Sequence, residues 1–113
     1  MTCQNSLTGI NDFYRGDTVP IALTITQNGT PVDITGSVIT ITFKKNKTDT
    51  TAVIQKNAVL TDPENGQALI TLTPTDTDID VDEYFYDIQW TDAGGNIRTL
   101  ILTTVQIKQD INN

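Results

Sequence analysis

Four aspartates occupy alternate positions just before the most regular apolar pattern of the chain: Asp76, Asp78, Asp80 and Asp82. Calcium-binding loops draw carboxylate ligands from alternate positions, so these residues are candidate metal ligands. The run lacks the glycine that bends an EF-hand loop, and Ile79 and Val81 between the carboxylates indicate a turn that packs on a core. We therefore expect a solvated acidic corner and no bound metal, with a calcium site as the alternative.

The aromatic residues of the next segment are candidates for binding a sugar ring. Residues 83–90 alternate between a polar and an apolar face, and the apolar face consists of Tyr84, Tyr86, Ile88 and Trp90. Exposed aromatics of this kind, together with Tyr14, would suit a carbohydrate. Because the spacing is that of a half-buried strand, we instead expect the four residues to pack in the core.

The inventory of catalytic side chains is short. The chain has no histidine, which excludes Ser-His-Asp triads, Cys-His pairs and metal sites with a histidine ligand. No glycine-rich phosphate loop occurs, and a thin domain of 113 residues leaves little room for a cleft with paired catalytic carboxylates. We expect neither an enzyme nor a cofactor.

Two short motifs have simple structural explanations. Arg15, Gly16 and Asp17 match the tripeptide of integrin-binding loops, but glycine and aspartate before a strand are ordinary turn residues. The lysines of residues 44–47, with Lys56, form a basic patch that would suit an acidic partner surface. The default interpretation of that patch is a solubilising loop.

Charge and hydropathy limit the possible partners. The formal net charge of -7 would repel a phosphate backbone or an anionic membrane surface. No apolar run approaches the roughly 18–20 residues of a membrane span. Cys3 is the only cysteine, so an internal disulfide is impossible, which fits a reducing compartment. We expect neither nucleic acid nor a membrane among the partners.

Short apolar runs separated by turns rich in Gly, Asn and Asp make up most of the chain. Alternation predicts strands over residues 19–26, 37–44, 67–73, 83–91 and 97–108, and a weak strand pair or bulged strand over 52–60. About seven strands at this spacing predict an all-β fold, an immunoglobulin-like antiparallel β-sandwich. We expect residues 13–113 to form this single domain and residues 1–12 to form a flexible arm or an edge strand.

Three local features follow from this arrangement. Asn28 and Gly29 predict a tight hairpin turn, because both adopt positive φ angles readily. Residues 75–82 are expected to cross between the two sheets, and we call them the acidic crossover. Tyr84 follows this crossover, where β-sandwiches place a tyrosine whose hydroxyl bonds back to the preceding loop. In the last strand, alternate residues from Ile97 to Ile107 are expected to share one face.

Six stretches, taken in order, resemble a known family. They are residues 14–18, 29–36, 62–66, 72–77, 83–89 and 95–100, beginning with Tyr-Arg-Gly-Asp-Thr. The series is similar to the immunoglobulin-like modules of tailed-bacteriophage virion proteins, and above all to the N-terminal domain of the baseplate upper protein family. The resemblance implies a structural, non-enzymatic protein that docks on a phage tail or baseplate and links it to fibres or receptor-binding subunits.

The resemblance therefore favours a virion protein that is assembled in the host cytoplasm and binds other virion proteins, as a homo-oligomer or in many copies. In the larger family members a linker and oligomerising domains follow this module, whereas this sequence ends at Asn113. A free-standing capsid decoration (cement) protein is thus one alternative. The alternative of another class is a carbohydrate-binding or adhesion module, which an accessible Tyr14 or Trp90 would favour.

Overall fold

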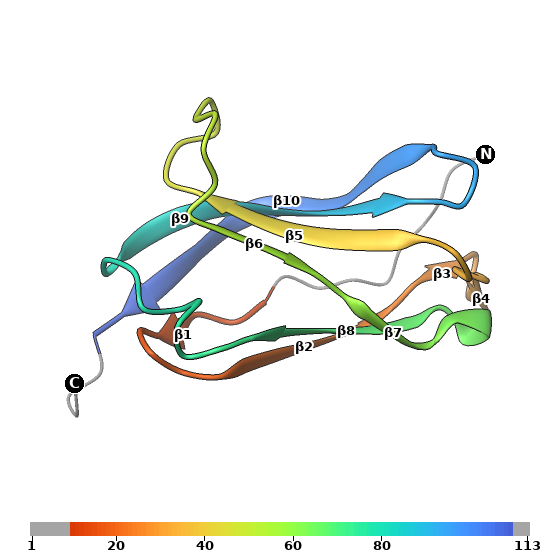
Figure 1. The fold of residues 1–113 in the computed structure, drawn as a ribbon, viewed down its shortest axis with the longest axis horizontal. Coiled ribbons are helices and arrows are strands. Elements are labelled where there is room, and N and C mark those ends of the chain that lie inside the picture. The colour runs from red at the N-terminus through yellow and green to blue at the C-terminus, as the bar shows by residue number, and fades with distance from the viewer. Residues whose placement is uncertain (1–9, 110–113) are drawn as a thin grey trace.

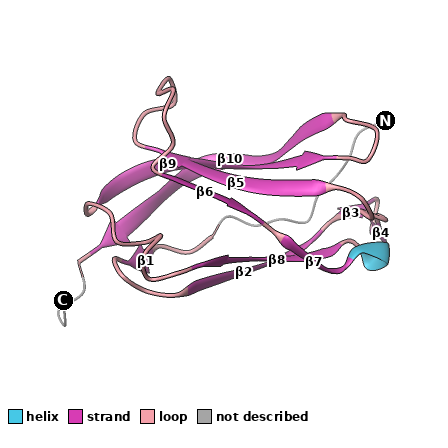
Figure 2. Ribbon diagram, viewed as in Figure 1, coloured by secondary structure: helices cyan, strands magenta, loops and turns pink. Residues whose placement is uncertain are grey.

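Ten strands and one helical turn make up the described part of the chain. The structure is a computed structural model that describes residues 10–109. The elements are β1 (Phe13–Tyr14), β2 (Val19–Thr24), β3 (Thr26–Gln27), β4 (Thr30–Pro31), β5 (Val38–Lys44), β6 (Ile54–Asn57), β7 (Val59–Asp62), the 3₁₀ turn η1 (Pro63–Asn65), β8 (Gln67–Leu72), β9 (Asp82–Thr91) and β10 (Ile97–Lys108). Figure 2 shows the dominance of strands. Among these residues, no helix has the length and apolar character needed to cross a membrane.

The strands form two layers that face each other (Figure 1). One layer is a five-stranded sheet in the order β1-β10-β9-β5-β6, and the other is a three-stranded sheet in the order β2-β8-β7. The orders β10-β9-β5 and β2-β8-β7 correspond to strands G-F-C and B-E-D of the immunoglobulin fold. The predicted all-β fold class is confirmed, and the strand order fits the predicted immunoglobulin-like sandwich.

The core lies between the two sheets and is built from alternate residues of each strand. On β9 the buried residues are Tyr84, Tyr86, Ile88 and Trp90. The ring of Phe43 on β5 lies beside that of Tyr86, with 5.4 Å between the centroids. The opposite sheet contributes the buried residues Ile21, Leu23, Ile70 and Leu72. Burying one apolar side chain of this size stabilises the folded protein by roughly 1.5–3 kcal/mol. The apolar residues at alternate positions therefore determine which face of each sheet turns inward.

The strand count differs from the expected seven. Three additional strands, β1, β3 and β4, have two residues each, which is too short for alternation to be detected. Residues 52–60 form neither a strand pair nor one bulged strand, because β6 pairs with β5 whereas β7 pairs with β8 in the opposite sheet. The chain changes sheets at Ala58, whose N–H donates to the Ile39 carbonyl (2.8 Å).

One strand pair is parallel, whereas the sequence predicted an antiparallel sandwich. Phe13 and Tyr14 lie opposite Ile107 and Lys108, in the same direction as β10. The Arg15 N–H continues this pairing with a hydrogen bond to the Lys108 carbonyl (2.8 Å). The chain passes along the edge of the five-stranded sheet before it crosses to the other sheet as β2, and this path sets the direction of β1.

The predicted arm, residues 1–12, lies mostly outside the described residues, and for residues 1–9 it stays a prediction. Residues 10–12 contact the five-stranded sheet. The Ile10 N–H donates to the Tyr86 hydroxyl (2.8 Å), and the Asp12 carboxylate accepts from the Gln106 N–H (3.0 Å). These residues are therefore held against the sandwich.

A β-bulge interrupts the predicted alternation of β10. The pairing with β9 shifts between Thr99 and Ile101, so Leu100 is an extra residue in the ladder. Leu100 is buried, whereas Ile97 is 64% exposed. The prediction of one shared face from Ile97 to Ile107 is therefore wrong, because one extra residue moves the period-two pattern by one position.

Two turns depend on backbone conformations with positive φ. Asn28 and Gly29 between β3 and β4 have φ angles of 53° and 81°, which confirms the predicted hairpin turn. Gly66, which follows η1, has a φ of 72°. Its N–H donates to the Pro63 carbonyl (3.1 Å), and its carbonyl accepts from the Ile25 N–H (2.8 Å). Gly66 thereby joins η1 to the end of β2.

Candidate functional site

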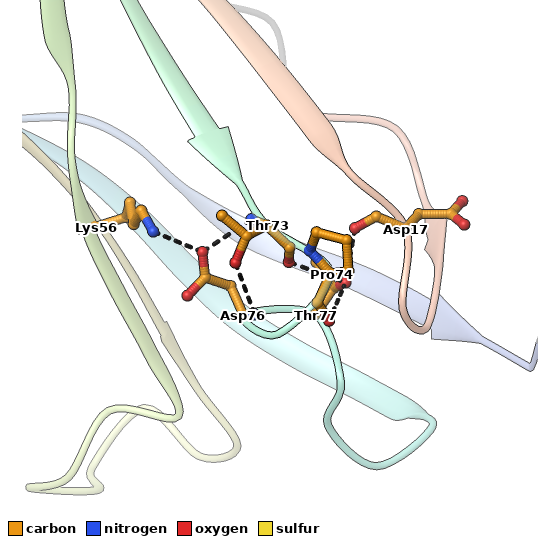
Figure 3. Close-up of polar contacts among 6 residues, drawn as sticks. All are labelled: Asp17, Lys56, Thr73, Pro74, Asp76 and Thr77. Carbon is orange, nitrogen blue, oxygen red and sulfur yellow. Dashed lines mark hydrogen bonds and ion pairs between the residues drawn. The ribbon is translucent and has the colours of Figure 1, made fainter.

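Asp76, in the acidic crossover between β8 and β9, is held by a cation from another strand. Its carboxylate accepts hydrogen bonds from the Lys56 ammonium (2.7 Å) and the Thr73 N–H (2.8 Å) (Figure 3). The hydrogen bond from Lys56, followed by that from Thr73, lowers the pKa of Asp76 below its ordinary value of 3.8. Since Lys56 lies on β6, the pair connects the five-stranded sheet to the turn that follows β8.

The other candidate calcium ligands of the crossover point to different partners. Asp78 accepts from the Arg15 guanidinium (3.0 Å), and a carboxylate oxygen of Asp82 lies 2.8 Å from the Lys45 ammonium. The hydrogen bond from Lys45 lowers the pKa of Asp82. The side chain of Asp80 is exposed. The structure does not bring the four aspartates together, and within residues 10–109 no three acidic, histidine or cysteine side chains are grouped to hold a metal ion.

Thr77 fixes the crossover from the inside and was not recognised in the sequence. It is fully buried, and its hydroxyl donates to the Asp17 carbonyl (2.7 Å) (Figure 3). The same hydroxyl lies 3.4 Å from the carbonyl oxygens of Thr73 and Pro74. A threonine in a polar, turn-rich segment gives no indication of burial, so only the three-dimensional arrangement reveals its role.

The Arg15-Gly16-Asp17 tripeptide contacts the acidic crossover. Arg15 is bonded to Asp78, Gly16 has a φ of 84°, and the Asp17 N–H donates to the Tyr14 carbonyl (3.1 Å). The tripeptide is therefore a turn that leads into β2, as the structural interpretation of the sequence expected.

The aromatic residues of β9 are fastened within the core by their polar atoms. The Tyr84 hydroxyl donates to the Asp80 carbonyl (2.7 Å), which is the predicted bond back to the preceding loop. Trp90 is 5% exposed, and its Nε1–H donates to the Ser37 hydroxyl (2.9 Å). Tyr14 is 48% exposed. Because Tyr84 and Trp90 face the core, they do not form a row on which a sugar ring could stack.

A shallow hollow lies on the outer face of the five-stranded sheet, below the loop that joins β5 to β6. In Figure 1 this loop rises from the sheet on the side away from the other layer. The hollow has a volume of about 480 Å³. Its lining includes Thr42, Phe85, Asp87, Gln89 and Leu102 from the strands and Lys47 from the loop. We refer to it as the Asp87 hollow.

Asp87 is the carboxylate of this hollow. Burial raises its pKa above the ordinary value of 3.8, and the nearby charge of Lys44 opposes this effect. Within residues 10–109 the Asp87 carboxylate accepts no hydrogen bond. The Lys47 ammonium lies 5.5 Å from the centroid of the Phe85 ring, within the range of a cation–π contact. Sequence analysis missed this site, because a carboxylate on the polar face of a strand is ordinary.

A second concavity runs along β2 and is lined by residues 10–14 and 17–24. β2 is an edge strand of its sheet. The Ile25 N–H donates to the carbonyl of Gly66, which precedes β8. Backbone N–H and C=O groups of alternate residues point to opposite sides of a strand, so those of Pro20 and Ala22 point away from β8. Pro20 has no N–H to offer there, and a proline on an edge strand hinders the addition of another strand.

Comparison with known proteins supports the resemblance noted in the sequence. Residues 1–86 match the family model of the BppU N-terminal domain, where BppU denotes the baseplate upper protein. The match covers most of the chain and ends within β9, so residues 95–100, the last of the six resembling stretches, lie beyond it. No curated protein matches the chain. The chain therefore belongs to the family of BppU N-terminal domains, which are structural components of the phage baseplate.

Proposed function

We propose that this protein is a non-enzymatic adaptor of the phage tail or baseplate, which binds other virion proteins in multiple copies and attaches fibres or receptor-binding subunits. Membership of the BppU N-terminal domain family carries this proposal. The absence of histidine from the sequence supports a role without catalysis. We further propose that residues 13–113 act as a single domain and that the protein joins the virion in the host cytoplasm.

The exposed strand edges suit contacts with neighbouring subunits. The five-stranded sheet ends at β6, and the three-stranded sheet ends at β7. Edge strands offer unpaired backbone groups to which another chain can add a strand. On β7, Val59 is 69% exposed, which adds an apolar contact at that edge. Because Pro20 hinders pairing at β2, the edges at β6 and β7 suit contacts between subunits better than the edge at β2.

Mass spectrometry of purified virions, combined with antibody-gold labelling, tests the adaptor function. We expect the protein at a copy number that is a fixed ratio of the other baseplate proteins, with gold at the distal end of the tail. Particles that lack the protein would overturn a virion role. Gold on the capsid would instead support the decoration alternative.

The exposed Tyr14 favours the carbohydrate-binding alternative, but this alternative has weaker support because the Trp90 ring is buried and the four crossover aspartates do not converge. Glycan arrays with and without calcium test it directly. Specific glycan binding by a protein that is absent from virions would replace the adaptor function with an adhesion role.

A further inference from the structure

Uncharged polar side chains of β5 and β6 lie beside the Asp87 hollow on the outer face of the five-stranded sheet, whereas the hollow itself is lined by one carboxylate and two lysines, Lys44 and Lys47. On this face, Thr40 donates to the Asn57 side chain (2.8 Å), and the Gln55 amide donates to Thr42 (3.3 Å). The chain carries 14 acidic residues, yet Asp87 is the only one among the residues that line the hollow.

The apolar residues of the hollow flank this carboxylate. Leu102 lies directly opposite Asp87 in the pairing of β10 with β9 and is 54% exposed. Phe85 lies two residues before Asp87 on the same face of β9. An aromatic ring and an aliphatic side chain thus border a carboxylate that accepts no hydrogen bond from the described residues. A planar cation could pair with the carboxylate and stack on the Phe85 ring, where it would take the place of the Lys47 ammonium that lies 5.5 Å from the ring centroid.

Resting on the adaptor function proposed above, we propose that the Asp87 hollow is the docking site for a partner virion protein, which inserts an arginine side chain between Phe85 and Leu102 to pair with Asp87. A guanidinium pairs with a carboxylate through two parallel hydrogen bonds and stacks on aromatic rings. The ammonium groups of Lys44 and Lys47 at the hollow favour acidic residues around that arginine. The partner surface is therefore an arginine surrounded by carboxylates.

A second copy of this chain does not fit the hollow as well. The chain has two arginines, Arg15 and Arg98, and they already form ion pairs with Asp78 (3.0 Å) and Asp92 (2.9 Å). A second copy would have to break one of these pairs to place a guanidinium in the hollow. The arginine is therefore expected to come from a different protein.

Binding of the purified protein to phage tails prepared without it tests the docking site. We expect Asp87→Asn to weaken binding at least about 30-fold, as for the loss of one partner of a desolvated charge pair. Glu83→Gln is the matched control, because Glu83 is exposed on the same face of β9 outside the hollow. Leu102→Ala, at an exposed position, should also weaken binding several-fold without affecting the fold. Wild-type affinity in both hollow variants would overturn the proposal.

A photo-crosslinking residue at Gln89 identifies the partner surface on the assembled tails. We expect the cross-linked peptide to contain an arginine, and exchange of the charges, Asp87→Arg together with that arginine changed to Asp, should restore binding. Cross-links to a second copy of this chain, or to a peptide without arginine, would overturn the proposal. If the wild-type protein does not bind tails at all, the adaptor function itself fails, which distinguishes the two failures.

Discussion

The Lys56 ammonium lies 2.7 Å from a carboxylate oxygen of Asp76, and this ion pair joins the two sides of the sandwich (Figure 3). Lys56 is on β6 of the five-stranded sheet, and Asp76 follows β8 of the three-stranded sheet. The side chains are 35% and 24% exposed, so solvent screens the pair only in part. Through this pair, a strand of the opposite sheet holds the crossover in place.

The Lys56–Asp76 pair should make stability depend on pH in the acidic range. Because the pKa of Asp76 is lowered in the folded protein, its contribution is present above the ordinary pKa of 3.8 and is lost as the pH falls through the lowered value. Asp76→Asn should reduce the free energy of unfolding by about 1 kcal/mol at pH 7 and by much less near pH 2. Urea denaturation of both proteins across this range measures the difference. An equal loss at every pH would contradict this explanation.

Gly66 should tolerate substitution far less well than Gly29. A Cβ atom at Gly66 would meet the carbonyl oxygens of Ile25 and Val32, whereas one at Gly29 has open space. Both residues have positive φ, which costs an alanine about 1–2 kcal/mol. Gly66→Ala should therefore destabilise the protein by about 3 kcal/mol or more, and Gly29→Ala by about 1 kcal/mol. Thermal unfolding of the two variants, compared with wild type, gives the ranking, and similar melting temperatures would contradict it.

The local pattern of the sequence was enough to predict most of the sheets. Strict alternation over residues 83–90 and the Asn28-Gly29 turn correspond to β9 and to the β3–β4 hairpin. The pattern failed where pairing depends on distant strands. It did not reveal that β6 and β7 belong to opposite sheets or that Leu100 forms a bulge, because neither is encoded in a period of two.

The sites were harder to predict than the strands. Alternate aspartates suggested a cluster, but the partners of Asp76 and Asp82 are lysines about 20 and 37 positions away in the chain, and their positions depend on the fold. The Asp87 hollow depends on a loop folding above residues of two other strands. No spacing rule predicts a concavity of this kind, since its residues are scattered along the chain.

Removal of the Tyr84 hydroxyl should weaken the junction between the crossover and β9. The hydroxyl donates to the Asp80 carbonyl (2.7 Å) in a partly buried position, so Tyr84→Phe should cost about 1–1.5 kcal/mol. Tyr14→Phe is the control, because Tyr14 is 48% exposed, and it should change stability by less than about 0.5 kcal/mol. Urea denaturation followed by Trp90 fluorescence measures both. Equal changes in the free energy of unfolding of the two variants would show that the Tyr84 hydroxyl does not stabilise the junction between the crossover and β9.

Asp87 should oppose folding, unlike Asp76. Because burial raises its pKa, the ionised carboxylate is disfavoured in the folded protein above the raised value, and this disadvantage disappears below the ordinary pKa of 3.8. Asp87→Asn should therefore increase the free energy of unfolding at pH 7 by less than about 1 kcal/mol, because solvent screens this partly exposed group and Lys44 opposes the effect, and the gain should vanish near pH 3. Glu83→Gln should have little effect at either pH. Urea denaturation at the two pH values tests the sign, and a loss of stability at pH 7 would mean that Asp87 supports the fold. A carboxylate that weakens its own domain has the property expected of a group retained for a partner.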